Sequence, residues 1–173
     1  MSWHEIVKYR PENYDENGAY KANEWTSISD IGKSYDGKIF TLENYLRVEQ
    51  RYIAVILSIM SRMNCKYLTV EYLEVDKNDI EKQINSSKDH TTDSLLVTSL
   101  IQLEQGKRIY YKNIDNVIRL ALREYIYIVL CNKQKKLKID FGYDYYLYVL
   151  CNLDNRILNN LVNSVGLYLD PRG

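Results

Sequence analysis

The chain has 173 residues, enough for one domain with its own core, and carries 23 Lys plus Arg against 23 Asp plus Glu. A neutral total excludes an overall field that would draw the whole chain to nucleic acid or to an anionic membrane. The balance is nevertheless uneven, because residues 105–138 carry 9 basic and 2 acidic side chains. One basic segment therefore has to be explained separately.

The three cysteines, Cys65, Cys131 and Cys151, lie far apart, each within or beside an apolar run. An odd count without close spacing indicates buried thiols rather than a disulfide framework or a zinc site. No window offers the roughly 18 uninterrupted apolar residues that span a membrane, and the first residues lack the apolar core of a signal peptide. We therefore expect a cytoplasmic protein that does not contact a membrane.

Residues 1–26 are polar and show no sustained period, which predicts an irregular N-terminal arm held by Trp3 and Trp25. Residues 27–173 are expected to form a single α+β domain. In its first part, Asp36-Gly37 is a turn signal between two short segments.

Thr41 is a predicted N-cap for the helix with the clearest apolar stripe, which ends near Asn64. The next residues, 66–75, are rich in β-formers and predict a covered strand. Three more helices are expected at 79–85, from Thr92 or Asp93 to 105, and from Asn113 to about 129.

Asp154 or Asn155 is expected to cap the last helix, which Gly166 ends, and residues 167–169 are expected to close the sheet.

The stretch from Leu137 to Cys151 is predicted to lie at the centre of the sheet. Its odd positions are apolar or aromatic, and its even positions begin with Lys138 and Asp140, which is the period of a strand. Gly142 allows the backbone to bend or to turn back, so one bent strand and a tight hairpin are both open. The whole pattern predicts an α+β fold with four to five helices on a small, mainly antiparallel sheet.

The residues offer no recognisable catalytic apparatus. The only histidines, His4 and His90, lie in polar segments far apart in the sequence, and the pairs of carboxylates are typical of solvated or partner-facing charge. We therefore expect a protein that is not an enzyme and needs no cofactor or metal.

Tyrosine is the compositional outlier, with 17 Tyr against 2 Phe and 2 Trp. Tyrosine gives rigid contact area with a polar tip, as interfaces require, although a coding bias would also raise its count. Acidic residues mixed with aromatic anchors suit a basic partner. The candidate partner-binding residues of this kind are Asp140, Tyr143, Asp144, Tyr146 and Tyr148, with Glu71, Tyr72 and Glu74 as a second group.

Four stretches, 25–53, 118–127, 141–149 and 166–170, together resemble a family of bacterial immunity proteins. These proteins are encoded beside polymorphic or contact-dependent growth-inhibition toxins. The resemblance implies a non-enzymatic toxin inhibitor that covers the active site of a cognate C-terminal toxin domain, commonly an RNase or other nuclease. It implies a monomer that forms a 1:1 complex and has no direct contact with nucleic acid.

An RNA-binding module is the alternative, in which the basic segment 107–138 holds the phosphate backbone and the tyrosine-rich strand stacks the bases. Titration with RNA at rising salt distinguishes the two, because phosphate contacts weaken steeply with salt.

Overall fold

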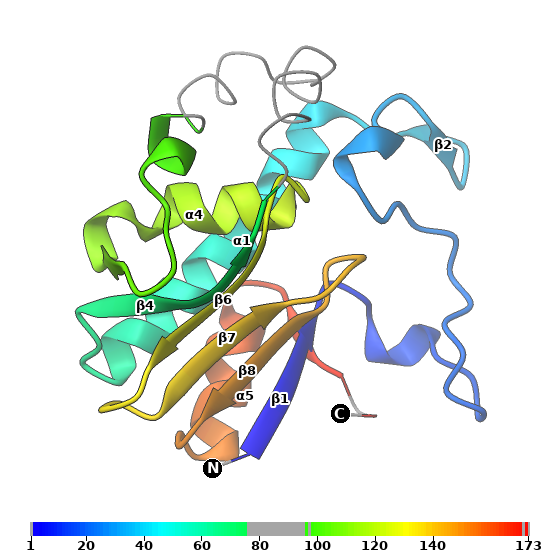
Figure 1. The fold of residues 1–173 in the computed structure, drawn as a ribbon. Coiled ribbons are helices and arrows are strands. Elements are labelled where there is room, and N and C mark those ends of the chain that lie inside the picture. The colour runs from blue at the N-terminus through cyan, green and yellow to red at the C-terminus, as the bar shows by residue number, and fades with distance from the viewer. Residues whose placement is uncertain (1, 76–95, 97, 171, 173) are drawn as a thin grey trace.

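A seven-stranded antiparallel sheet organises the computed structural model, which describes residues 2–75, 96, 98–170 and 172 (Figure 1). The strand order is β5-β4-β6-β7-β8-β1-β9. The strands are β1 Ser2–Val7, β4 Tyr67–Glu74, β5 Arg108–Tyr110, β6 Tyr127–Asn132, β7 Leu137–Phe141, β8 Leu147–Cys151 and β9 Tyr168–Leu169. The predicted α+β class and the central position of the 137–151 stretch are confirmed.

Three helices, α1 Leu42–Arg62, α4 Ile114–Leu122 and α5 Asn155–Ser164, lie behind the sheet in Figure 1 and cover one of its faces. The predicted caps are confirmed, because Thr41 accepts from the Asn44 amide and Asp154 from the Arg156 amide. Residues 98–101 are also helical. The expected helix at 79–85, and the start of the one expected from Thr92 or Asp93, lie outside the described residues.

The expected helix from Asn113 to 129 is wrong in its second half. Helix α4 ends at Leu122, and Tyr127 already begins strand β6. Glu124 takes the left-handed conformation, φ 62°, and the Tyr125 amide bonds back to the Leu120 carbonyl, so the chain leaves the helix where no glycine marks an end. The β-branched residues that follow then pair in the sheet.

The central stretch is a hairpin, which decides between the two alternatives. Beyond the last ladder pair, Phe141 and Leu147, the Gly142 amide donates to the Tyr146 carbonyl at 2.8 Å. Asp144 and Tyr145, with φ of 54° and 64°, make the tight turn between the strands. A short turn at Asp36-Gly37 is likewise confirmed, joining β2 Ser34–Tyr35 to β3 Lys38–Ile39.

The expectation of an irregular arm is wrong for Ser2–Val7, which form strand β1 between β8 and β9. Only Ile6 and Val7 of this strand are buried, so its sequence shows no clear alternation of buried and exposed residues. The strand is formed by pairing with β8 and β9, which lie far away in the sequence.

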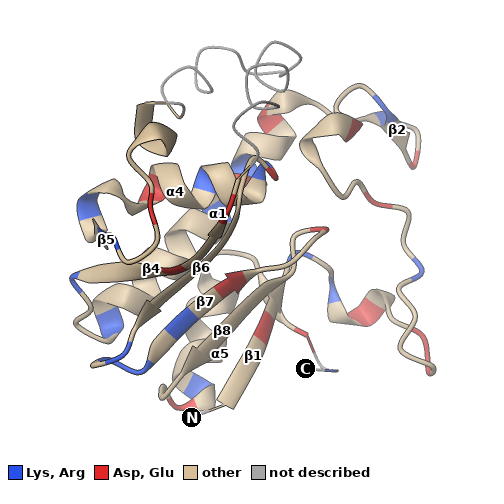
Figure 2. Cartoon of the chain, viewed as in Figure 1, with Lys and Arg blue, Asp and Glu red and all other residues tan. Residues whose placement is uncertain are grey.

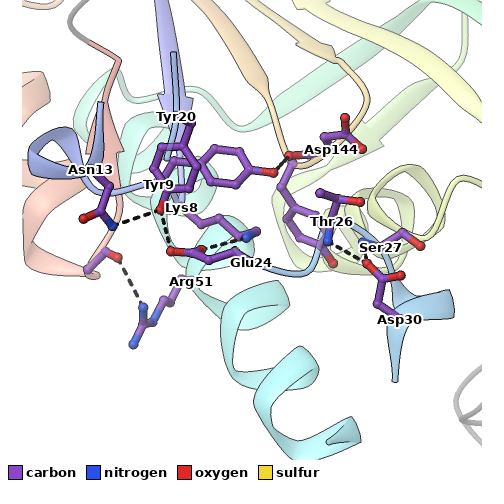
Figure 3. Close-up of polar contacts among 12 residues, drawn as sticks. Lys8, Tyr9, Asn13, Tyr20, Glu24, Thr26, Ser27, Asp30, Arg51 and Asp144 are labelled. Carbon is purple, nitrogen blue, oxygen red and sulfur yellow. Dashed lines mark hydrogen bonds and ion pairs between the residues drawn. The ribbon is translucent and has the colours of Figure 1, made fainter. Parts of the chain in front are cut away.

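The rest of the arm is held by aromatic and polar contacts near the central hairpin (Figure 3). Trp25 stacks on Phe40 with ring centroids 4.3 Å apart, as expected, whereas Trp3 stays half-exposed. Lys8 is buried against the Trp25 ring and pairs with Glu24 at 3.1 Å. Burial lowers the pKa of Lys8, an effect that Glu24 opposes.

The core lies between the helices and the covered face of the sheet, and it contains a buried ion pair. The Glu49 carboxylate on α1 accepts from Arg123 Nε at 2.7 Å and also binds Arg119, which joins α1 to the α4 region. Cys65, Cys131 and Cys151 are buried free thiols, as predicted. Within the described part of the chain, no helix combines the length and apolarity needed to cross a membrane.

Candidate functional site: the open face of the sheet

The face of the sheet opposite the helices, which we call the open face, carries charged residues of both signs (Figure 2) and several exposed tyrosines. The two faces follow from the period of the strands: along β7, Leu137, Ile139 and Phe141 are buried against the helices, so Lys138 and Asp140 project outward. One continuous cross-strand row on the open face is formed by Tyr72, Val129, Asp140, Tyr148 and Glu5.

Several large side chains on or beside this face are accessible. The exposed fractions are 83% for Tyr143, 47% for Trp3, 45% for Tyr72, 42% for Tyr127 and 37% for Tyr148. Antiparallel sheets commonly leave one face to water, but that face is usually polar. A tyrosine-rich open face is instead typical of a surface that a partner covers.

A pocket of about 510 Å³ opens where β4, β6, β7 and the central turn meet. We call it the acidic-aromatic pocket. Its lining residues are Glu74, Val75, Glu124, Tyr125, Ile126, Tyr127, Asp140, Phe141, Gly142, Tyr143 and Tyr148. Three of them are carboxylates and four are tyrosines, while none of these described lining residues is Lys, Arg or His. The volume falls within the range of ordinary ligand pockets.

The structure brings part of both predicted groups into this pocket. Asp140, Tyr143 and Tyr148 come from the first group, and Glu74 comes from the second. Tyr72 lies beside them, because its hydroxyl donates to Glu74 at 3.3 Å. These residues therefore form one acidic and aromatic surface, although they are far apart in the sequence.

Tyr127 links the two groups and was not predicted from the sequence. Its ring centroid lies 5.6 Å from that of Tyr72, and its hydroxyl lies near the Asp140 carboxylate. Desolvation, and then the nearby Asp140, raise the pKa of Tyr127, so the phenol stays protonated. The sequence signal for Tyr127 is the Tyr-Ile-Val run, which is typical of a strand. This signal was missed because residues 113–129 were interpreted as one helix.

Glu124 is the second residue that sequence reasoning missed. It follows α4 in a left-handed conformation, φ 62°, where glycine is the usual residue. Desolvation, followed by repulsion from Asp144, raises the pKa of its carboxyl. An acidic side chain is thus held in a costly backbone conformation at the rim of an already acidic pocket, which is typical of a functional position.

Gly142 is packed against side chains and backbone of the protein itself. A Cβ at this position would lie 2.8 Å from Cε2 of Tyr148 and 3.3 Å from the Tyr146 carbonyl oxygen. The space beside the glycine is therefore filled by the protein itself. Glycine lets the Tyr148 ring lie against the turn and form a wall of the pocket.

Asp144 and Tyr146 of the first predicted group do not line the pocket. The Asp144 carbonyl accepts from the Tyr9 hydroxyl at 2.7 Å, while its carboxylate points away from Tyr9 (Figure 3). Tyr146 packs against Tyr9, with centroids 5.5 Å apart, and its hydroxyl accepts from Arg172 at 3.4 Å. These contacts fasten the turn to the N- and C-terminal segments.

Glu71 of the second group is also separate from the pocket. It lies at the β-bulge of β4 and pairs with Lys138 at 2.6 Å. This ion pair marks the boundary between the acidic and basic ends of the open face.

A second pocket, of about 270 Å³, lies at the basic end. We call it the basic pocket, and its lining residues are Tyr67, Thr69, Arg108, Cys131, Asn132, Lys133 and Gln134. The Arg108 guanidinium already lies over the Tyr67 ring, 4.7 Å from its centroid. The basic segment does not act as one field, because Arg119 and Arg123 bind Glu49 and Lys138 binds Glu71.

Comparison of the chain with family models, curated proteins and solved structures found no match. The geometry of the open face is therefore the basis for a functional proposal.

Proposed function

We propose that this chain is an immunity protein that binds a bacterial toxin domain through the acidic end of its open face. The single observation that carries the proposal is the acidic-aromatic pocket, which gathers three carboxylates and four tyrosines without a basic residue among its described lining. Such a surface complements a basic site and supplies aromatic anchors at its centre. The family resemblance of the sequence supports a toxin as the partner.

A nuclease toxin that acts in the cytoplasm is the partner that this chemistry favours. A nuclease must hold phosphates, so its active site is basic, and a surface that covers it needs negative charge there. In this proposal inhibition requires no catalysis by the chain. One copy covers one toxin domain, because the pocket and its neighbouring tyrosines make one continuous patch.

The direct experiment is to purify this chain together with the C-terminal domain encoded immediately upstream of it and to measure binding and cell protection. We expect a 1:1 complex and survival of cells that express both proteins. Tyr148→Ala, which removes a wall of the pocket, should weaken both readouts, whereas Glu12→Ala on the exposed arm should change neither. A folded wild-type chain that neither binds nor protects would contradict the proposal.

The basic pocket favours RNA binding as a second candidate function. Arg108 and Lys133 offer positive charge beside Tyr67 on the same sheet. The test is to measure RNA affinity at rising salt with wild type and with Lys133→Gln. RNA binding predicts a steep salt dependence that the substitution reduces by about one phosphate contact. Toxin binding through the acidic end predicts no measurable RNA affinity.

A further inference from the structure

The acidic-aromatic pocket combines two features that favour one kind of chemical group. Its carboxylates come from three separate elements, β4, β7 and the segment after α4, so the fold brings like charges together. The positive charge of an incoming cation would offset both the desolvation that raises the pKa of Glu124 and the repulsion from Asp144 that adds to it. The pocket as it stands therefore favours an incoming positive charge.

The walls of the pocket distinguish between the cations that proteins offer. Tyr127, Tyr143 and Tyr148 present aromatic rings beside the carboxylates. A guanidinium is planar, stacks on such rings and donates in a fork that fits a carboxylate with two bonds. A lysine ammonium is a more strongly hydrated point charge and cannot stack on the tyrosine rings as a planar guanidinium does.

We propose that the acidic-aromatic pocket receives an arginine side chain of the bound partner, with Asp140 as the principal acceptor. This inference rests on the proposed function and adds the chemical identity of the group at the centre of the interface. Asp140 is preferred because it lies on β7 in the middle of the sheet, directly beside Tyr148 on β8, and lines the pocket together with Tyr127. The adjacent tyrosines then exclude water from the ion pair.

The first experiment uses small probes, so that its outcome does not depend on the toxin. N-acetyl-arginine amide is titrated into the labelled protein while the backbone amides of Gly142 and Tyr127 are followed by NMR. N-acetyl-citrulline amide is the matched control, since it has nearly the same shape but no charge. We expect saturable shifts at the pocket with arginine, weaker shifts with the corresponding lysine amide, and none with citrulline.

Substitutions in the protein then test whether the arginine probe binds at Asp140. Asp140→Asn should weaken the arginine probe about ten-fold, because a charge-assisted pair is replaced by a neutral hydrogen bond. Glu12→Gln removes the same charge from the exposed arm and should leave the affinity unchanged. Equal shifts with citrulline, no saturable shift with arginine, or an unchanged affinity in Asp140→Asn would each overturn the inference.

A second arm separates this inference from the proposed function. Each arginine of the upstream-encoded toxin domain is replaced by lysine, and binding is measured against wild type and Asp140→Asn. One replacement should be strongly non-additive with Asp140→Asn. If the toxin binds but no arginine couples to Asp140, only the arginine inference fails. If the probe binds and the toxin does not, the proposed function fails.

Discussion

The two faces of the sheet contrast sharply although they share the same strands. On β7, Ile139 is fully buried against the helices, while its neighbour Asp140 faces outward into the acidic-aromatic pocket. The covered face is apolar, and the core behind it holds the Glu49–Arg123 ion pair, whereas the open face keeps acidic and basic ends. In the proposed function, stability and partner binding thus depend on alternate residues of one strand, so substitutions can change one without the other.

The largest expected effect is on stability and comes from the covered side. Glu49→Ala removes the buried carboxylate that Arg119 and Arg123 both bind, so the unfolding free energy should fall by about 3–5 kcal/mol. The measurement is urea unfolding followed by circular dichroism. Glu43→Ala, which removes an exposed carboxylate from the same helix, is the control and should change the unfolding free energy by less than about 1 kcal/mol.

The next effect is on partner binding and distinguishes the pocket from the turn. Asp140→Ala should weaken toxin binding by about 2–5 kcal/mol, because it leaves the partner's charge unpaired in a covered interface. Asp144→Ala should have a smaller effect, since Asp144 lies outside the pocket lining. Titration calorimetry with the toxin domain measures both, after thermal melting shows that each variant folds. The opposite order would move the interface from the pocket to the tip of the turn.

A smaller effect is expected where the two faces meet. Gly142→Ala places a Cβ against the Tyr148 ring and the Tyr146 carbonyl, so the ring must move. We expect toxin binding to weaken by roughly 1–2 kcal/mol, with a loss of stability of similar size from strain in the turn. Tyr148→Ala combined with Gly142→Ala provides the check. If the ring carries the effect on binding, the glycine substitution should cost almost nothing further in the double variant.

The smallest expected effect comes from Glu124→Gly, which should raise stability and weaken toxin binding. Glu124→Gly relieves the left-handed strain at that position and should raise the unfolding free energy by roughly 0.5–1 kcal/mol. Because the pKa of Glu124 is raised in the folded protein, its ionisation opposes folding. The advantage of the variant should therefore grow as the pH rises from below the pKa of a free glutamate to neutrality.

Toxin binding of Glu124→Gly should weaken, because the pocket loses one carboxylate. Chemical unfolding at several pH values and calorimetry with the toxin domain test the two signs. A variant that is less stable than wild type at neutral pH would contradict the strain argument.

The sequence predicted those features that depend on local patterns. The period of two in 137–151, the caps at Thr41 and Asp154 and the Asp36-Gly37 turn were all confirmed. The sequence did not predict strand β1, which pairs with strands far away in the sequence. It also did not predict the end of helix α4, where Glu124 takes the left-handed conformation in place of a glycine. Four of the eight candidate residues line the pocket, but strand order decides which residues meet, so Tyr127 and Glu124 could not be placed beside them.

The pairing of β1 has a consequence for synthesis on the ribosome. Ile6 pairs with Leu147 and Leu169, so β1 leaves the ribosome long before either neighbouring strand exists. At elongation rates of roughly 5–20 residues per second, the intervening chain of about 140 residues takes on the order of ten to thirty seconds to make. During that time β1 has no native strand partner, and the edge of the sheet is completed only near the end of translation.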